Sequence, residues 1–367
     1  MKLIFCIVLL SFCLNGIGNR SKCYRDTSIV FGCNFIPSTA INQLEMWQAE
    51  SFDTTTISKE LKWASSIGMN TIRVFLHDLV YKEDPKGFLK RMDVFLSIAN
   101  RYHIKTLFVF FDSCWDPFPA IGKQPDPVPY RHNSHWVQSP GANVLNDSTE
   151  YPRLEIYVKA VVKRFADDKR VFGWDVWNEP DNANEGTYSK VELPNKNSYV
   201  LTLLPQAFMW ARSQHPIQPL TSAVWKFYGN WNTNYQLDSI ERVQVANSDM
   251  LSFHYYGNAA DLEKRIVWMK KFNKSMVCTE YLARGNHSTF ETCLPVFVKY
   301  GIGAMNWGLV SGKTQTIYPW QSWSKAYTTE PEVWHHDIFR QDGTAYSSEE
   351  VAFIKSVIVK PEKKGQH

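Results

Sequence analysis

Two glutamates stand at the ends of apolar runs that are typical of buried strands. Glu179 closes the run Val171–Pro180 (VFGWDVWNEP), and Glu280 closes Met276–Glu280 (MVCTE). Runs that are apolar on both faces suit strands of a parallel sheet, and in an α/β barrel all strands end at the catalytic face. Either glutamate alone also fits a loop acid that caps a helix. Together they suit a facing pair, in which one carboxyl group donates a proton and the other attacks.

Other chemically useful side chains end further apolar runs: Arg73, Asp112, Asn178, His254, Tyr256 and Trp307. Arg73 is a natural partner for Glu280, and Tyr256 can donate a hydrogen bond to it. Both contacts lower a carboxyl pKa, so Glu280 is expected to be ionised. Glu179, flanked by Trp177 and facing a second negative charge, is expected to have a raised pKa and to hold the proton.

The elements that must bring these residues together are short apolar runs separated by segments of helical period. The runs are Ile29–Phe35, Thr71–Leu76, Thr106–Phe111, Val171–Trp177, Pro219–Ala223, Met250–His254, Met276–Glu280 and Ala304–Trp307. Strands that alternate with helices pair in parallel through right-handed crossovers, and eight such units close a barrel. The sequence therefore predicts one α/β domain, a (β/α)8 TIM barrel spanning residues 19–367.

Two connections are longer than a barrel requires, at residues 112–148 after the third strand and 308–334 after the eighth. They carry tryptophans that we expect to contact substrate: Trp115, Trp136 and Trp320. Long structureless segments in a compact domain are usually functional, and exposed aromatic rings are useful where a ligand docks on them. Both loops are expected to form walls of a cleft. Asp112, where the first loop begins, is expected either to touch substrate or to orient Arg73.

The amino-terminal residues 1–18 have the pattern of a secretory signal peptide, with Lys2, an apolar run and then small residues. The remaining chain contains no apolar stretch long enough to span a bilayer. The full sequence has 40 basic and 36 acidic residues, so it carries no charge excess suited to nucleic acid. We therefore expect a secreted, extracellular, soluble and monomeric protein. Four sequons are compatible with a glycoprotein, beginning at Asn19, Asn146, Asn273 and Asn286.

Five cysteines follow the signal segment, so at least one thiol is left without a partner in the chain. Cys23 with Cys33 and Cys278 with Cys293 are candidate disulfides, although spacing alone does not establish either pair. No CxxC or HExxH motif is present. We therefore expect neither a metal nor another cofactor.

Five motifs in order along the chain together resemble clan A of the glycoside hydrolases, and within it family 5, the cellulase and mannanase group. They are Arg73 in TIRVF, Asn178-Glu179-Pro180, His254-Tyr255-Tyr256, Glu280 in VCTEY, and Trp307. The resemblance implies that Glu179 is the acid/base, that Glu280 is the nucleophile and that the anomeric configuration is retained. It covers nearly all of the chain after the signal segment.

One position departs from the family pattern. Members of family 5 commonly carry histidine at the end of the third strand, where this chain has Asp112. The stretches FFDSCWDPFP and HNSHWVQSPG resemble a set of poorly characterised cellulase-like or xylanase-like proteins, and this resemblance does not identify the sugar.

The predicted function is that of a retaining β-glycoside hydrolase acting on a β-linked polysaccharide or oligosaccharide, with endo-β-mannanase or endoglucanase activity. The expected substrates are β-1,4-mannan and β-1,4-glucan, and the sequence does not choose between them. A transglycosylase would use the same two glutamates. A carbohydrate-binding barrel without activity would usually lack one of them.

Overall fold

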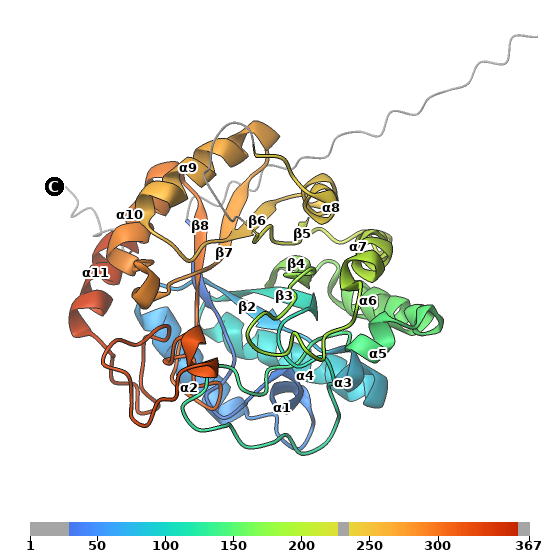
Figure 1. Ribbon diagram of the computed structural model, residues 1–367, viewed down its shortest axis with the longest axis horizontal. Coiled ribbons are helices and arrows are strands. Elements are labelled where there is room, and N and C mark those ends of the chain that lie inside the picture. Colours follow the sequence, from blue (N-terminus) through green and yellow to red (C-terminus); the bar gives the residue numbers. More distant parts are fainter. Residues whose placement is uncertain (1–28, 227–234, 359–367) are drawn as a thin grey trace, which may run out of the picture.

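The computed structural model describes residues 29–226 and 235–358, which contain eight parallel strands ringed by helices (Figure 1). The strands are β1 (Phe31–Asn34), β2 (Thr71–Phe75), β3 (Lys105–Asp112), β4 (Val171–Asn178), β5 (Leu220–Thr221), β6 (Leu251–His254), β7 (Met276–Tyr281) and β8 (Gly303–Trp307). Their order is β5-β4-β3-β2-β1-β8-β7-β6. The predicted α/β barrel is confirmed, and all eight predicted strands are present.

The barrel closes between β5 and β6 through a short contact beyond the end of β5. Val224 forms a parallel bridge with Phe253. The amide of Val224 donates to the carbonyl of Ser252 at 3.0 Å, and the amide of His254 donates to the carbonyl of Val224 at 3.2 Å. This closure holds His254, at the end of β6, in the ring of strand ends.

The helices cover the outside of the strands. They are α1 (Gln43–Trp47), α2 (Thr54–Ser66), α3 (Asp78–Glu83), α4 (Pro85–Arg101), α5 (Ala142–Leu145), α6 (Tyr151–Phe165), α7 (Lys196–Arg212), α8 (Ser239–Asn247), α9 (Ala259–Met269), α10 (Phe290–Tyr300) and α11 (Ser348–Ile358). In α4 and α6 the apolar residues at helical spacing are buried against the sheet, as the sequence pattern predicts. None of the helices described is long and apolar enough to cross a membrane.

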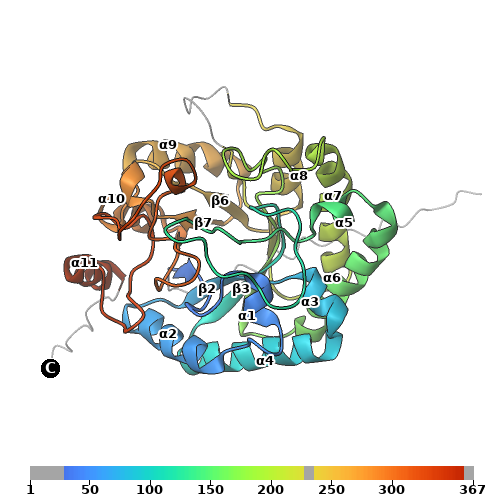
Figure 2. The ribbon, with the colours of Figure 1, turned by 60° about the horizontal axis from the view of Figure 1, so that its bottom comes forward.

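The two long connections lie over the carboxyl ends of the strands, the teal loop after β3 and the orange-red loop after β8 in Figure 2. They are joined to each other by hydrogen bonds to backbone carbonyls. The amide of Asn133 donates to the carbonyl of Thr314 at 2.8 Å. The indole of Trp323, in the short 3-10 helix η4 (Trp320–Trp323), donates to the carbonyl of His132 at 2.8 Å. The loops therefore form one continuous wall.

The candidate disulfide between Cys278 and Cys293 is wrong, because both residues are free and buried thiols. Cys278 lies in β7 and Cys293 in α10. Cys33, in β1, is also a buried free thiol, while Cys23 and the signal segment lie outside the described residues. The domain core thus depends on packing rather than on these cross-links.

Gly32 permits close approach of β1 and β2, and we predict that Gly32→Ala destabilises the barrel. A Cβ at this position would lie 1.6 Å from the carbonyl oxygen of Thr71. Separating the strands to accommodate it should lower the free energy of unfolding by about 1–3 kcal/mol. Chemical denaturation measures the effect. Gly285→Ala is the matched control, because its nearest heavy atom would be the Nδ1 of His335 at 3.6 Å. Equal stability of the two variants would contradict the packing argument.

Candidate active site

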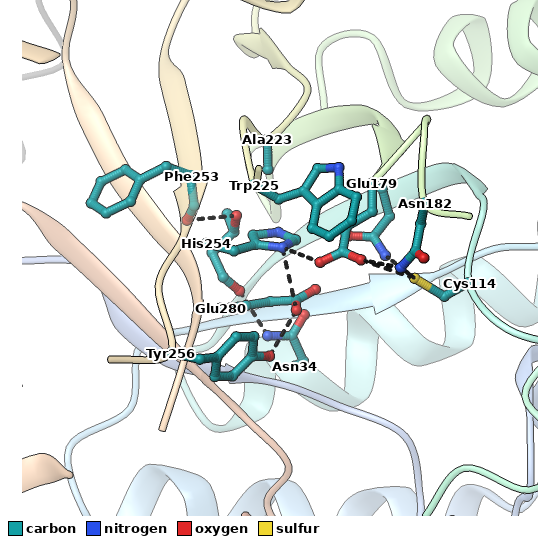
Figure 3. Close-up of polar contacts among 12 residues, drawn as sticks. Asn34, Cys114, Glu179, Asn182, Ala223, Trp225, Phe253, His254, Tyr256 and Glu280 are labelled. Atoms are coloured by element: carbon teal, nitrogen blue, oxygen red, sulfur yellow. Dashed lines mark hydrogen bonds and ion pairs between the residues drawn. The ribbon is translucent and has the colours of Figure 1, made fainter. Parts of the chain in front are cut away.

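Glu179 follows the last residue of β4 in a backbone conformation that is uncommon for a residue with a side chain. Its φ is +42°, in the left-handed region. The carbonyl of Glu179 accepts from the amide of Asn182 at 2.9 Å, which closes a turn directly after the strand. The side chain points toward His254 and Glu280 (Figure 3). Backbone strain of this kind is concentrated at functional sites.

Arg73, in β2, is the fully buried centre of the site. Its guanidinium donates to Glu280 Oε1 at 2.6 Å and to Asp175 Oδ2 at 2.9 Å. It also donates to the side-chain oxygens of Asn34 at 2.9 Å and Asn178 at 2.7 Å. One cation therefore orients side chains from β1, β4 and β7.

Glu280 has a second donor on its other oxygen. The hydroxyl of Tyr256 donates to Oε2 at 2.8 Å, and Nδ1 of His254 lies 3.4 Å from the same atom. The structure therefore places Arg73 and Tyr256 against Glu280, the two contacts that the sequence suggested for it.

His254 connects the two glutamates. Its Nδ1 lies 2.8 Å from Glu179 Oε1, so this ring nitrogen faces both carboxyl groups. One oxygen of Glu179, one oxygen of Glu280 and one nitrogen of His254 all lie within 4.8 Å of one another. Burial lowers the pKa of His254 to about 3, so the imidazole is neutral at physiological pH. The two carboxyl groups therefore face each other without a charged histidine between them.

Burial raises the pKa of Glu179 to about 7, with hydrogen bonds from Asn182 and Cys114 acting in the opposite direction. Burial also raises the pKa of Glu280, against the attraction of Arg73 and the hydrogen bond from Tyr256. The expected lowering of the Glu280 pKa is therefore wrong, because loss of hydration outweighs both partners. The environments still differ, since only Glu280 is in direct ion-pair contact with a guanidinium. Glu179 is the better proton donor near neutral pH.

Two groups beside Glu179 were not identified from the sequence. The amide of Asn182 donates to Oε2 at 2.7 Å, and the thiol of Cys114 donates to the same oxygen at 3.3 Å. Cys114 lies two residues beyond β3, and Asn182 lies three residues after Glu179. Neither stands at a strand end, which was the criterion used to select site residues.

Asp112 does not line the cleft, so the expected contact with substrate is wrong, and it is linked to Arg73 only through Asn178. It is 1% exposed, and its oxygens accept from the side-chain amide of Asn178 at 2.9 Å and from the indole of Trp136 at 2.7 Å. The Asn178 amide oxygen therefore faces Arg73 while its nitrogen faces Asp112. Trp136 is 2% exposed and packs behind Trp307, so its expected contact with substrate is also wrong. Both residues support the site from beneath.

The remaining predicted residues line a single cleft of about 900 Å³. Those lining it are Glu179, Glu280, Asn178, His254, Tyr256, Trp307, Trp115 and Trp320. Trp225 and Trp323 line it as well, and Trp323 stacks on Trp115 with ring centroids 5.6 Å apart. Trp320 packs edge-on against Tyr256, with centroids 5.0 Å apart. The cleft thus offers flat aromatic faces around the two carboxyl groups.

Glu179, His254 and Glu280 also form the group among the described residues that has the spacing of a metal site. Both oxygens of Glu280 already accept from Arg73 and Tyr256. A cation bound between them would lie close to the guanidinium charge, which opposes its binding. The arrangement therefore suits proton transfer and nucleophilic attack better than metal ligation.

No protein-family model matches the sequence, and no curated protein matches it either. Solved structures with the same fold include the β-1,4-D-mannanase from Cryptopygus antarcticus, with 12% identity and a TM-score of 0.59 over 92% of each chain. The β-1,4-mannanase from the sea hare Aplysia kurodai shares 17% identity, with a TM-score of 0.53 over 76% of this chain and 88% of its own.

The GH5_18 enzyme from Streptomyces cattleya in complex with GlcNAc shares 12% identity, with a TM-score of 0.57 over 92% of this chain and 81% of its own. At these identities the likeness establishes the fold. The resemblance to family 5 expected from the sequence is confirmed at that level.

Removing the amide donor beside Glu179 should raise the pKa of this residue further. Because Asn182 stabilises the ionised form, we predict that Asn182→Ala moves the pKa above about 7, by up to about one unit. Carbon-13 NMR of labelled glutamate side chains measures the titration, with Glu179→Gln used to assign the signal. Asn197→Ala, which removes an exposed amide on the same cleft, is the control. A downward shift in Asn182→Ala would contradict the assigned hydrogen bond.

Proposed function

We propose that the protein is a retaining β-glycoside hydrolase in which Glu179 is the acid/base and Glu280 is the nucleophile. The observation that carries the proposal is the facing pair, with one oxygen from each carboxyl group within 4.8 Å and different partners around each. Retaining enzymes hold their two carboxyl groups close together, whereas inverting enzymes leave room for a water molecule between one carboxylate and the sugar.

In the first step Glu280 attacks the anomeric carbon while Glu179 donates its proton to the glycosidic oxygen. The bond from that carbon to the oxygen breaks, the remainder of the substrate leaves as an alcohol, and the sugar is esterified to Glu280. A pKa of about 7 leaves Glu179 substantially protonated at neutral pH. Arg73 and Tyr256 hold Glu280 in place through one hydrogen bond to each oxygen.

In the second step Glu179, now ionised, removes a proton from a water molecule that attacks the same carbon. The ester bond to Glu280 breaks, the sugar is released with its original configuration, and Glu179 is protonated again. His254 orients Glu179 through its Nδ1. Asn178 is held by Arg73 and Asp112 and borders the cleft, and we propose that it meets a sugar hydroxyl beside the reacting carbon.

A β-1,4-linked mannan or glucan chain is the proposed substrate class, with xylan behind them. The aromatic faces of Trp115, Trp225, Trp307 and Trp320 suit the apolar faces of sugar rings. Mannan is placed first because two of the structures with the same fold are named as β-1,4-mannanases.

Transglycosylation would use the same groups with a sugar in place of water, and a binding barrel without turnover would need neither carboxyl group to titrate near pH 7.

We also propose that the protein is secreted, on the basis of the amino-terminal signal pattern, and that it acts as a monomer. Among the sequons, Asn146 and Asn273 are exposed and Asn286 is half-buried at the cleft. Exposed sequons suit glycosylation during secretion.

Glu280→Ala should abolish hydrolysis, because it removes the atom that attacks the anomeric carbon. We expect a loss of roughly 10³-fold or more in kcat, with partial recovery when azide or formate is added with an activated aryl glycoside. Product analysis should then show a glycosyl azide of inverted configuration.

The matched control is Glu185→Ala, an exposed acid on the same cleft, which should retain activity. Wild-type turnover should be unchanged by a chelator such as EDTA. Full activity of Glu280→Ala would contradict the assignment of the nucleophile.

Glu179→Gln should discriminate between leaving groups, because it removes the proton donor and leaves the nucleophile intact. We expect a loss of about 10²–10⁴-fold on natural polysaccharide, and a much smaller loss in the first step on aryl glycosides that leave without protonation. Steady-state and burst kinetics on both substrates measure the difference. In the wild-type protein kcat/KM should fall as the pH rises above about 7, because Glu179 loses its proton. Equal losses on both substrates would show that Glu179 is not the acid.

A further inference from the structure

The cleft occupies one side of the barrel mouth. Its lining residues come from the loops after β3 to β8, and none of those described precedes Cys114 in the sequence. The loops after β1 and β2 therefore contribute none of the described residues that line this cleft. A cleft that bound a long chain across the mouth would need this side to be open.

The space between the cleft and β1 is filled by aromatic side chains behind Trp307. The ring of Trp136 lies 5.6 Å from that of Trp307, and the ring of Phe75 lies 5.8 Å from it. The small cavity that remains there, which Asn133 also lines, measures about 10 Å³. This volume holds about one water molecule, so no sugar ring fits beyond Trp307.

Above this packing, three loop segments form a continuous cover, which we call the cap: residues 37–45, 122–138 and 312–316. The backbone amide of Lys313 donates to the carbonyl of Ser38 at 3.0 Å, and its ammonium pairs with Glu45 at 2.5 Å. Gly312 packs so closely that an added Cβ would lie 2.5 Å from the Cα of Ser38. The loop after β8 is therefore bound to the loop after β1.

The loop after β3 is bound into the same cap. The side-chain amide of Asn42 donates to Gln124 Oε1 at 2.8 Å and to the carbonyl of His135 at 2.9 Å. Gln43, in α1, donates to the carbonyl of Val137 at 3.0 Å. Figure 2 shows this teal loop passing beside α1. With the bond from Asn133 to Thr314, every pair of the three segments is directly linked.

The chemistry assigns the two ends of the cleft. Glu179 protonates the departing oxygen, so the leaving group lies on the Glu179 side, where Trp225 stands beside Glu179 and His254 (Figure 3). In the proposed reaction the sugar attacked by Glu280 would occupy the other end, beside Trp307, which lines the same cleft. That end points toward β1, where the cap and Trp136 close the cleft.

From this arrangement we propose that the protein is an exo-acting enzyme, which removes one sugar at a time from the non-reducing end of a β-linked oligosaccharide. The proposal rests on the glycoside hydrolase function above and narrows its substrate class. It departs from the endo activity expected from the sequence, because the long aromatic loops close the cleft rather than extend it. The 4-hydroxyl of the bound terminal sugar faces the closed end, which leaves no path for a further sugar.

Three substrates of the same sugar series test the closed end. They are a 4-nitrophenyl β-monoglycoside, the β-1,4-linked trioside, and the trioside with its terminal 4-hydroxyl methylated, each made with mannose and with glucose. In the series that is turned over, we expect the monoglycoside to be hydrolysed and the trioside to lose single sugars from its non-reducing end. The methylated trioside should react at least about 100-fold more slowly, because the added methyl group would clash with the closed end of the cleft.

Mass spectrometry of the products separates the outcomes. A methylated di- or trisaccharide released from the methylated trioside would overturn the exo proposal while supporting glycosidase activity. No hydrolysis of any substrate in either series would overturn both. Glu280→Ala is assayed in parallel, and absence of hydrolysis of all substrates by this variant excludes a contaminating glycosidase.

Discussion

The buried positive charge of Arg73 is the interaction on which the rest of the site depends. A guanidinium without access to water is tolerated only when it is paired and its donors are satisfied. Asp175 and Glu280 supply the charge, and Asn34 and Asn178 supply neutral acceptors. Because these partners come from three other strands, the requirement to compensate one charge fixes the relative positions of the strand ends. Loss of Arg73 would leave the carboxylates buried without a counter-charge.

The division of labour between the two glutamates follows from what surrounds each of them. Glu280 is held by an ion pair and a phenol, whereas Glu179 is held by an amide, a thiol and a neutral imidazole. Burial raises the pKa of both carboxyl groups. Hydrogen bonds from Asn182 and Cys114 oppose this rise at Glu179, whereas the charge of Arg73 and the hydrogen bond from Tyr256 oppose it at Glu280. A carboxyl group whose pKa is raised to near 7 by burial is suited to donate and accept a proton within one catalytic cycle.

The tryptophans illustrate how one residue type serves two purposes. Trp115, Trp225, Trp307, Trp320 and Trp323 line the cleft. Trp136 and Trp334 lie in equally polar loop sequences but are buried, and Trp136 supports Asp112 through its indole nitrogen. Aromatic side chains of a long loop can pack against one another and form a small hydrophobic core that holds the loop in place. In this protein that core closes one end of the cleft, and so it bears on which substrates can enter.

The sequence by itself determined the barrel, the eight strands and the placement of Glu179, Glu280, Arg73 and Tyr256 at one face, because strand ends in a parallel barrel converge whatever the loops do. It also indicated the contacts of Glu280 with Arg73 and Tyr256, which lie at the ends of other strands of the same barrel. Only the tertiary structure decided the roles of Asp112, Trp136, Cys114 and Asn182, and the closure of the cleft by the cap. These depend on how loops distant in sequence pack together, and loop contacts carry no periodic pattern that a sequence can reveal. The balance between burial and ion pairing at Glu280 was likewise decided there, since hydration is lost only when the whole barrel surrounds the group.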